Sequence, residues 1–413
     1  MWPRGGETYR HPSIRALGLG LALLALLLAA CSSGSSKPST TTPQTGSGSP
    51  TATASATGSP YLIGIDDASS GPAGFLGQDE VKTVKLVVDQ VNAAGGINGH
   101  PIKLESRDNG GDAKQAVVIA KALLEQHPVA LMGGAVVAQM KAIEPLVTNG
   151  PLVVDFGSGY TPPTPSYVFS ISPYDYSAID ATFRWFRGHN ITKFGLLAST
   201  DSTGQLAVDE IQHVLKEPAN QGLQLVGTER FEPSAPDVTP QLTRLKSDSP
   251  QAIIAWQTGA PAAVVAKDFT QLNLDMPLVV SWGNGSFSFA KATQSFAPKN
   301  LYVPVFKAMV YDQLPANDPF AASGKSIAEE WQKLYGTRPD IGLFLAYDPI
   351  KILLQALKEA GPDSSKMVKY IEGIHNYQGV AAIYSFSTTD HKGGGSEAIT
   401  LAAVQDGQFH AAK

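Results

Sequence analysis

The sequence predicts an α/β protein made of two doubly wound lobes. Short apolar runs of strand length alternate with longer runs of helical period between residues 61 and 154, which is typical of a parallel sheet covered by helices. The same alternation starts again at residue 194 and continues to residue 281. Roughly 350 residues follow residue 60, and a chain of that length favours two lobes over one continuous core.

The first strand, helix and second strand are the most clearly marked elements. Residues 61–65 are an apolar run, and apolar side chains then return at helical spacing between Val81 and Val91. Glycines 95, 96 and 99 end that helix, and an alternating pattern at 102–105 predicts a second strand parallel to the first. The later elements expected in this lobe are helices at 113–125 and 137–147, strands at 129–132 and 152–154, and an extended run at 167–170.

A helix through Phe183, Trp185 and Phe186 leads into the second lobe. Strands are expected there at 194–198, 223–230, 252–256 and 278–281, and helices at 206–216, 239–246 and 261–272. The repeated order of strand and helix predicts a second sheet of the same kind.

The N-terminal residues are typical of an export signal. Three arginines precede an apolar run at 16–30, which is too short to span a bilayer comfortably but suits the core of a signal peptide. The run ends directly before Cys31, the single Cys of the chain, and resembles the site where bacterial lipoproteins are cleaved and lipidated. We therefore expect a signal peptide at 1–30 and a lipid anchor at Cys31; the alternative is an ordinary signal peptide with a chance Cys.

Residues 31–60 consist almost wholly of Ser, Thr, Gly, Pro and Ala, with Lys37 as their one charge, and cannot bury a core. A flexible tether of this length reaches roughly 30 Å root-mean-square. With Cys31 lipidated, the exported domain has no Cys left for a disulfide.

Charge and motifs argue against nucleic-acid binding and catalysis. Removal of residues 1–30 takes away three Arg and one Glu and changes the net charge from −5 to −7, which disfavours nucleic acid as a partner. The sequence has no G-x-S-x-G, H-E-x-x-H or P-loop motif, and its eight His have no ligand spacing. We expect no enzyme activity, no cofactor and no metal.

Two motifs carry a resemblance to a known family. The first strand runs into the loop Ser70–Pro72 with Phe75 beside it, and the following helix ends in NAAGGING at Asn92–Gly99. This pattern resembles type I periplasmic solute-binding proteins of the branched-chain amino acid, amide and urea group, over nearly all of the chain after residue 60. The resemblance implies a monomer that delivers a small solute to the permease of an ABC importer. A receptor that reports its ligand to a separate membrane protein is the alternative, and a scaffold with an empty cleft is a third hypothesis.

The resemblance also implies a hinge of three crossings between the lobes. Residues 301–306 are expected to cross back, and helices at 327–335 and 343–360 to cover the first lobe. Because Pro349 follows Asp348 inside the longer helix, we expect a kink there or a restart of the helix with Asp348 as its N-cap. The third crossing is expected near 377–382, with 381–386 and 399–405 as closing strands of the second lobe. The lobes would then be 61–177 with 308–378, and 178–307 with 379–413.

Ligands of open α/β sheets bind at the carboxyl ends of the strands, so we expect the site in six loops: 69–76, 133–139, 155–161, 199–205, 257–260 and 282–286. Amino acid binders of the family use Ser or Thr hydroxyls for the ligand carboxylate, and an acid with Tyr for the ammonium. This sequence departs from that pattern at most points. The candidate ligand-binding residues are Phe75, Leu76, Val136, Val137, Gly157, Ser158, Gly159, Thr203, Thr258, Trp282 and Asn284.

The departures predict a ligand without a free α-ammonium. No acid stands where the family carries one, and a buried ammonium without a compensating charge costs several kcal/mol. The cleft therefore suits a neutral or anionic, partly apolar molecule held by backbone donors at Gly157–Gly159 and covered by Trp282, with Asn284 as an alternative polar contact. The aromatic side chains Phe75, Phe156, Tyr160, Trp256 and Trp282 have core packing as their alternative role. Asp67, Asp155 and Asp201 are more often helix caps than ligand partners at such positions.

Overall fold

The structure is a computed structural model, which describes residues 56–71, 74–134, 136–157, 159–174 and 176–412. Its first sheet has the strand order β2-β1-β3-β4-β5, and each neighbouring pair is parallel. This is the doubly wound order that the alternation predicts. The strands are β1 (Tyr61–Asp67), β2 (Ile102–Asp108), β3 (Ala130–Gly133), β4 (Leu152–Asp155) and β5 (Val168–Ser170). The predicted signal peptide, Cys31 and most of the linker lie outside the described residues.

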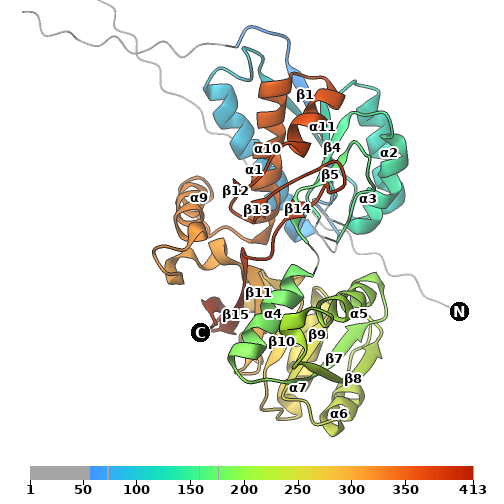
Figure 1. The fold of residues 1–413 in the computed structure, drawn as a ribbon, viewed down its shortest axis with the longest axis vertical. Helices are drawn as coiled ribbons and strands as arrows, with labels where there is room; N and C mark the ends of the chain where they lie inside the picture. Colours follow the sequence, from blue (N-terminus) through green and yellow to red (C-terminus); the bar gives the residue numbers. More distant parts are fainter. Residues whose placement is uncertain (1–55, 72–73, 135, 158, 175, 413) are drawn as a thin grey trace, which may run out of the picture. The chain divides into compact units, whose positions relative to one another are not determined.

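Helices cover both faces of the first sheet, as Figure 1 shows. Ile63 and Val154 pack with one group of helices, whereas Leu131 and Val153 point to the other face. The first group is α1 (Gly74–Ala93), α10 (Ile341–Ala360) and α11 (Ser364–Glu372); the second is α2 (Ala113–Leu124) and α3 (Val137–Ile143). The helix predicted at 137–147 is shorter, because the chain changes to a 3₁₀ turn at Glu144–Leu146, where Pro145 lacks a backbone N–H.

The NAAGGING motif has a clear structural role at the end of α1. Gly95, Gly96 and Gly99 have positive φ angles of 100°, 73° and 82°, and a Cβ on Gly96 would lie 2.1 Å from the carbonyl oxygen of His100. The side chain of Asn92 donates to the carbonyl of Ile102 at 2.8 Å and accepts from its N–H at 2.7 Å. The motif therefore stops α1 and fixes the start of β2.

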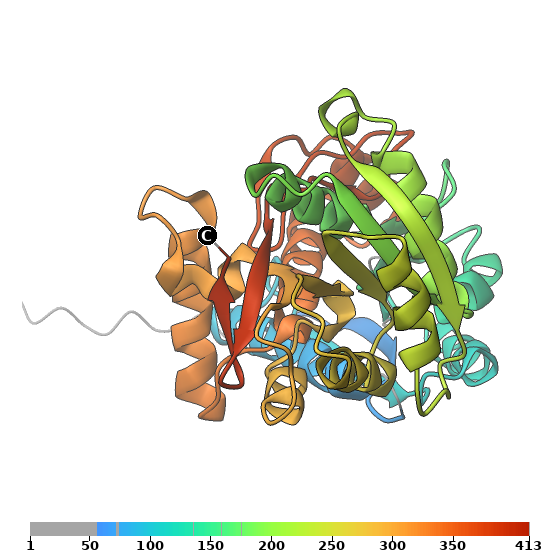
Figure 2. The same ribbon diagram turned by 90° about the horizontal axis from the view of Figure 1, so that it is seen from below.

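The second sheet repeats the first and adds a hairpin. Its order is β16-β15-β11-β10-β9-β7-β8. The neighbouring strands β11, β10, β9, β7 and β8 run parallel, whereas β15 pairs antiparallel with β11 and β16 antiparallel with β15. Figure 2 shows β15 and β16 in red with the C-terminal end of the chain. The strands are β7 (Lys193–Ser199), β8 (Gln224–Phe231), β9 (Ala252–Trp256), β10 (Leu278–Val280), β11 (Leu301–Phe306), β15 (Ile399–Gln405) and β16 (Gln408–Ala411).

The helices of the second lobe also lie on two faces of its sheet. α4 and α5 pack with Leu196 and Ile254, and α6 and α7 pack with Leu197 and Ile253. The helices are α4 (Ser177–Gly188), α5 (Ser202–Val214), α6 (Thr239–Ser247), α7 (Ala260–Gln271) and α8 (Phe287–Thr293). Helix α9 (Pro319–Tyr335) contacts α1 of the first lobe, where Gln90 bonds to Glu330 and the hydroxyl of Tyr335 donates to the carbonyl of Lys82 at 3.4 Å. The prediction that residues 301–306 cross between the lobes is wrong, because they form β11 inside this sheet and the chain leaves it afterwards.

A small third sheet lies where the chain passes between the lobes. Its order is β12-β13-β14-β6, made of β12 (Tyr377–Gln378), β13 (Ile383–Tyr384), β14 (Gly393–Gly394) and β6 (Ser172–Pro173). The prediction that 381–386 closes the second sheet is therefore wrong, since Tyr384 and Phe386 pack in the core of the first lobe. The strand predicted at 399–405 is confirmed as β15. The bounds given to the two lobes stay a prediction.

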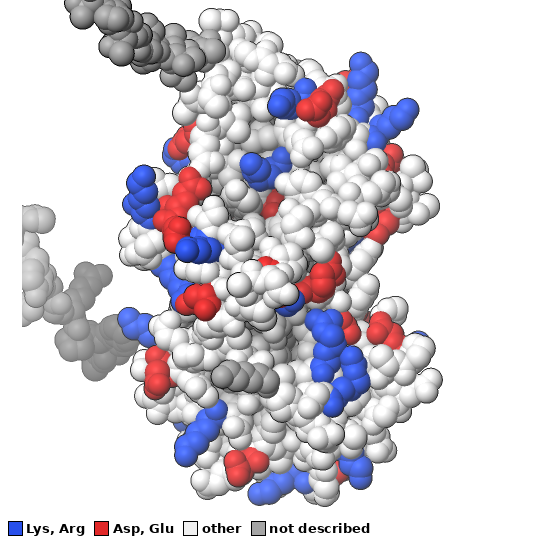
Figure 3. Space-filling view, turned by 60° about the vertical axis from the view of Figure 1, so that its left-hand side comes forward, with Lys and Arg blue, Asp and Glu red and all other residues white. Residues whose placement is uncertain are grey.

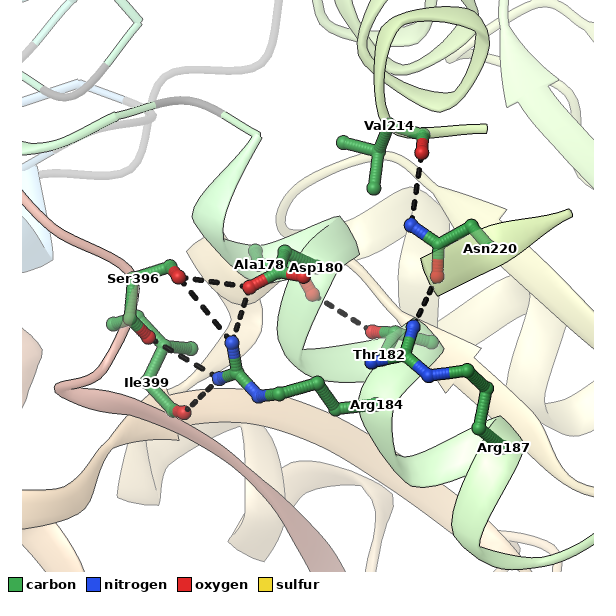
Figure 4. A network of polar contacts seen from close by, with 9 residues as sticks. All are labelled: Ala178, Asp180, Thr182, Arg184, Arg187, Val214, Asn220, Ser396 and Ile399. Atoms are coloured by element: carbon green, nitrogen blue, oxygen red, sulfur yellow. Dashed lines mark hydrogen bonds and ion pairs between the residues drawn. The ribbon is translucent and has the colours of Figure 1, made fainter. Parts of the chain in front are cut away.

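Hydrogen bonds tie the first crossing segment to the third. β6 pairs with β14, and the N–H of Tyr174 donates to the carbonyl of Gly394 at 3.1 Å. Figure 4 shows Arg184 of α4 donating to the carbonyls of Ser396 and Ile399 at 3.2 and 3.0 Å and pairing with Asp180. One guanidinium thus fixes the start of β15 to α4.

Helix α10 differs from the prediction in one respect. It runs without interruption from Ile341 to Ala360, and its N-cap is Asp340. The predicted restart at Asp348 is wrong, because the buried Asp348 carboxylate faces another segment: it accepts from the N–H groups of Val380 and Ala381 at 2.9 and 2.8 Å. In the part of the chain that the structure describes, no helix combines the length and apolar character needed to cross a membrane.

Candidate functional site

A cavity of about 340 Å³ lies at the carboxyl ends of the strands and receives side chains from both lobes. Five of the six predicted loops contribute to it, and the described residues of the loop at 69–76 do not. The lining residues are Val137, Lys141, Gly159, Ser202, Thr203, Gln205, Leu206, Asp209, Trp256, Thr258, Ser281 and Trp282. Of the predicted site residues, the cavity brings together Val137, Gly159, Thr203, Thr258 and Trp282.

The floor of the cavity is formed by the ends of β9 and β10. The hydroxyls of Thr258 and Ser281 lie 3.2 Å apart, and Ser281 donates to the carbonyl of Gln257 at 2.6 Å. Asn284 holds this arrangement from behind: it is 1% exposed, donates to the carbonyl of Gln257 at 2.7 Å and accepts from the N–H of Gly259 at 2.9 Å. Because its amide is engaged on both sides, Asn284 shapes the floor and does not line the cavity.

Trp282 has both of the roles that the sequence left open. It lines the cavity, and its half-buried ring packs against two core clusters, one of which also contains Leu86 of α1 and Phe344 of α10. The ring centroid lies 6.1 Å from that of Phe306, which in turn lies 6.0 Å from Phe344 of α10. An aromatic chain thus connects the cavity to the first turns of α10. Trp256 also lines the cavity, although it is only 4% exposed.

One wall of the cavity is a face of α5 that the sequence analysis did not predict. The prediction placed 199–205 in a loop, but α5 already begins at Ser202, because Asp201 is its N-cap and accepts from the N–H of Gly204 at 3.1 Å. The lining residues Ser202, Leu206 and Asp209 recur at helical spacing. The Ser-Thr-Gly sequence after Asp201 was the available signal for this earlier start.

The opposite wall comes from α3 and the loop after β4. Val137 and Lys141, four residues apart on α3, line the cavity beside Gly159. A Cβ on Gly159 would lie 2.5 Å from a methyl group of Val137, so a side chain at 159 would collide with α3. Lys141 and Asp209 are the charged residues among the described lining residues, and the sequence analysis named neither of them.

The remaining predicted residues lie away from the cavity. Gly157 is buried, and its N–H donates to the carboxylate of Asp155 at 3.1 Å, so that this backbone donor is already engaged. Phe75 and Leu76 are half-buried in the first turn of α1, where Leu76 packs on the core, and Val136 is the N-cap residue of α3. Ser158 lies outside the described residues. Phe156 and Tyr160 are core residues, 0% and 2% exposed.

Buried polar side chains lie at the carboxyl end of the first sheet. Asp66 accepts from the amide of Asn109 at 2.8 Å, and Asn109 accepts from Gln139 at 2.6 Å. Burial raises the pKa of Asp66 to about 7 despite the hydrogen bond from Asn109. Burial, together with the neighbouring Asp67, also raises the pKa of Glu80 well above its ordinary value. Among the described residues there is no group of three or more His, Cys, Asp or Glu arranged to hold a metal ion.

Charge on the surface is mixed. Figure 3 shows Lys and Arg interspersed with Asp and Glu on the face that it presents, without a stripe of one sign. Such a face offers no track for a phosphate backbone.

Known proteins resemble this chain in sequence and in fold. A family model described as periplasmic binding protein matches residues 60–408. Leu/Ile/Val-binding protein homolog 7 of Brucella abortus is 21% identical over 334 residues, which are 77% of this chain and 82% of the relative. A solved structure of an extracellular ligand-binding receptor from Rhodopseudomonas palustris has a TM-score of 0.74 at 22% identity, and the match covers 86% of this chain and 99% of that one.

A second solved structure is the branched-chain amino acid transporter substrate binding protein LivJ from Streptococcus pneumoniae in complex with isoleucine. Its TM-score is 0.69 at 20% identity, and the match covers 86% of this chain and 99% of that one. These likenesses confirm the predicted type I fold of two doubly wound lobes.

Proposed function

Because this chain belongs to the periplasmic binding protein family, we propose that it captures a small solute outside the cytoplasm and delivers it to the permease of an ABC importer. The observation that carries the proposal is the cavity of about 340 Å³, to which two lobes contribute side chains at the carboxyl ends of their strands. A site divided between two lobes couples binding of a solute to the relative position of the lobes, which a membrane partner is able to sense.

We further propose that the solute is amino-acid-like, an amide or a carboxylate with an apolar or aromatic body and without a free α-ammonium. Trp256, Trp282, Val137 and Leu206 give the cavity large apolar surfaces, and hydroxyls such as that of Thr258 give it a few polar contacts. The carboxylate present, Asp209, comes from the third turn of α5 and already accepts from Gln205 at 3.0 Å.

The test begins with a thermal-shift screen of amino acids, amides, short carboxylates and aromatic acids on the purified protein, because a tight ligand raises the melting temperature by mass action. Calorimetry of the best ligand then compares Trp282→Ala with wild type. We expect a loss on the order of 1 to 3 kcal/mol if the ring contacts the ligand. Trp185→Ala is the matched control, since Trp185 stacks on His189 of α4 outside the cavity.

Two results would contradict this proposal. Tight binding of leucine would show that the proposed class of solute is wrong. If no small molecule stabilised the folded protein, the hypothesis of a scaffold with an empty cleft would replace that of a solute-binding protein. A receptor role remains the alternative within the family, and uptake of the identified solute by cells with and without the protein separates transport from sensing.

We also propose that the protein acts as a monomer anchored to the membrane by lipidated Cys31. The coincidence of an apolar run, small residues and the single Cys supports the anchor. Cys31→Ser is expected to release the protein from the membrane fraction. An unchanged amount in that fraction would place the anchor elsewhere.

A further inference from the structure

Lys141 is the cationic residue of the cavity. It lies one helical turn after Val137 on α3, and both residues line the cavity from the side of the first lobe. It is the one Lys or Arg among the described lining residues, it is exposed, and no hydrogen bond or ion pair joins its ammonium group to another described residue. Its charge is therefore available to a molecule in the cavity.

The one carboxylate of the lining has partners of its own. Asp209 accepts from the amide of Gln205 at 3.0 Å, and the oxygen of that amide accepts from the guanidinium of Arg230 at 3.4 Å. Two hydrogen bonds thus lead from the guanidinium of Arg230 through the amide of Gln205 to the carboxylate of Asp209, so the negative charge of Asp209 is partly compensated within the second lobe. The lining therefore carries one cation without a partner among the described residues and one carboxylate that already accepts a hydrogen bond.

The surroundings of Lys141 favour a ligand with an anionic group at one end and an apolar body at the other. Val137 and Leu206 are apolar neighbours in the cavity, and Trp256 and Trp282 lie on its floor. A carboxylate at Lys141 leaves the body of the same molecule against these apolar side chains. An ammonium group placed at Lys141 would face a like charge, which disfavours binding there.

We propose that Lys141 is the specificity-determining residue of the cavity, pairing with the carboxylate of a small organic acid whose apolar or aromatic body contacts Trp256 and Trp282. This inference rests on the proposed function, because it assumes that the cavity is the solute site. The inference restricts the proposed class of solute, which included neutral and anionic molecules, to anionic molecules.

The experiment uses matched acids and amides, which differ in charge but hardly in shape. Calorimetry on the full-length protein measures 4-hydroxybenzoate against 4-hydroxybenzamide and 4-methylpentanoate against 4-methylpentanamide, with leucine as the ammonium-bearing probe. We expect wild type to bind at least one acid about tenfold more tightly than its amide. The preference should weaken as the ionic strength rises.

Variants then assign the preference to a residue. Lys141→Met is expected to abolish the preference for the acid by weakening the acid and leaving the amide unchanged, whereas Lys141→Arg keeps the charge and retains the preference. Lys121→Met, at an exposed position of α2 outside the cavity, is the matched control and should behave as wild type.

The possible outcomes separate the inference from the proposed function. If acids bind but Lys141→Met keeps the preference, the role of Lys141 is overturned and the solute-binding function stands. If Lys141→Met weakens acid and amide equally, Lys141 acts on the cavity itself and not on the carboxylate of the ligand, and the inference is again overturned. If no probe binds wild type, the proposed class of solute is wrong, and the inference falls with it.

Discussion

Asp66 shows how burial of a single carboxyl group makes stability depend on pH. Its pKa rises from 3.8 to about 7 in the folded chain, mainly because it is buried, so the folded state holds a proton that the unfolded state has released. The contribution of this proton to the free energy of unfolding is complete below pH 3.8 and is lost as the pH rises through about 7. We expect wild type to be more stable near pH 5 than near pH 8.

The variant Asp66→Asn tests this expectation, because an amide accepts the hydrogen bond from Asn109 but does not ionise. Urea unfolding at several pH values should give a flatter dependence for the variant, with a change on the order of a few kcal/mol between pH 5 and 8. Some slope should remain, since the pKa values of Asp340 and Asp348 also rise, to about 6, chiefly through burial. Asp275→Asn, at an exposed position, is the control, and equal slopes for both variants would contradict the assignment.

At the scale of single residues, the sequence allowed the floor of the site to be predicted, but of its helical walls only Val137 and Thr203. Thr258 and Trp282 directly follow apolar strands, and the carboxyl ends of parallel strands meet at one edge of the sheet. Lys141 and Asp209 lie within helices, and the side of a helix that faces a cavity depends on how the two lobes approach each other. The predicted role of Gly157 as a backbone donor to the ligand is wrong, because its N–H donates to the carboxylate of Asp155.

At the scale of elements, α10 shows why Pro349 does not start a new helix. Pro349 lacks a backbone N–H, so a helix start at Asp348 was a reasonable expectation from sequence. The helix continues because its buried face packs along the core of the first lobe, and the Asp348 carboxylate bonds to a segment distant in sequence. Such tertiary contacts do not appear in local sequence patterns. The same limit applies to β13, whose pairing partners β12 and β14 are only two residues long.

The contacts of Asp348 predict a large effect of its removal. Asp348→Ala leaves the N–H groups of Val380 and Ala381 without their acceptor, and the hydroxyl of Tyr384 also loses a bond of 3.2 Å. We expect the free energy of unfolding at pH 7.5 to fall by about 3 kcal/mol, because each buried unsatisfied N–H costs about 1 to 3 kcal/mol. Lys358→Ala on the exposed side of α10 is the control and should change it by less than about 0.5 kcal/mol. An equal, small effect of both variants would contradict this role of Asp348.

At the scale of the whole molecule, the two doubly wound sheets follow from the repeated alternation of strands and helices. The crossings were harder to place, since β6 and β14 are pairs of residues without a hydrophobic period of their own. Their pairing, together with the bonds of Arg184 to the carbonyls of Ser396 and Ile399, ties the crossing segments to one another and to α4. One core cluster also joins side chains of α1 and α10 to those of the second sheet.

Two sheets joined by crossing segments, with a cavity lined from both lobes, predict closure of the lobes on the ligand. A ligand that contacts Lys141 on one wall and Trp282 on the other is bound more tightly when the lobes are close together, so binding shifts the population toward that state. Small-angle scattering of the protein saturated with its tightest ligand should give a smaller radius of gyration than scattering of the free protein. An amide or acid that causes no thermal shift, added at the same concentration, should leave the radius unchanged. If saturation with the tight ligand also leaves it unchanged, closure is contradicted, and the cavity binds its solute without a hinge motion.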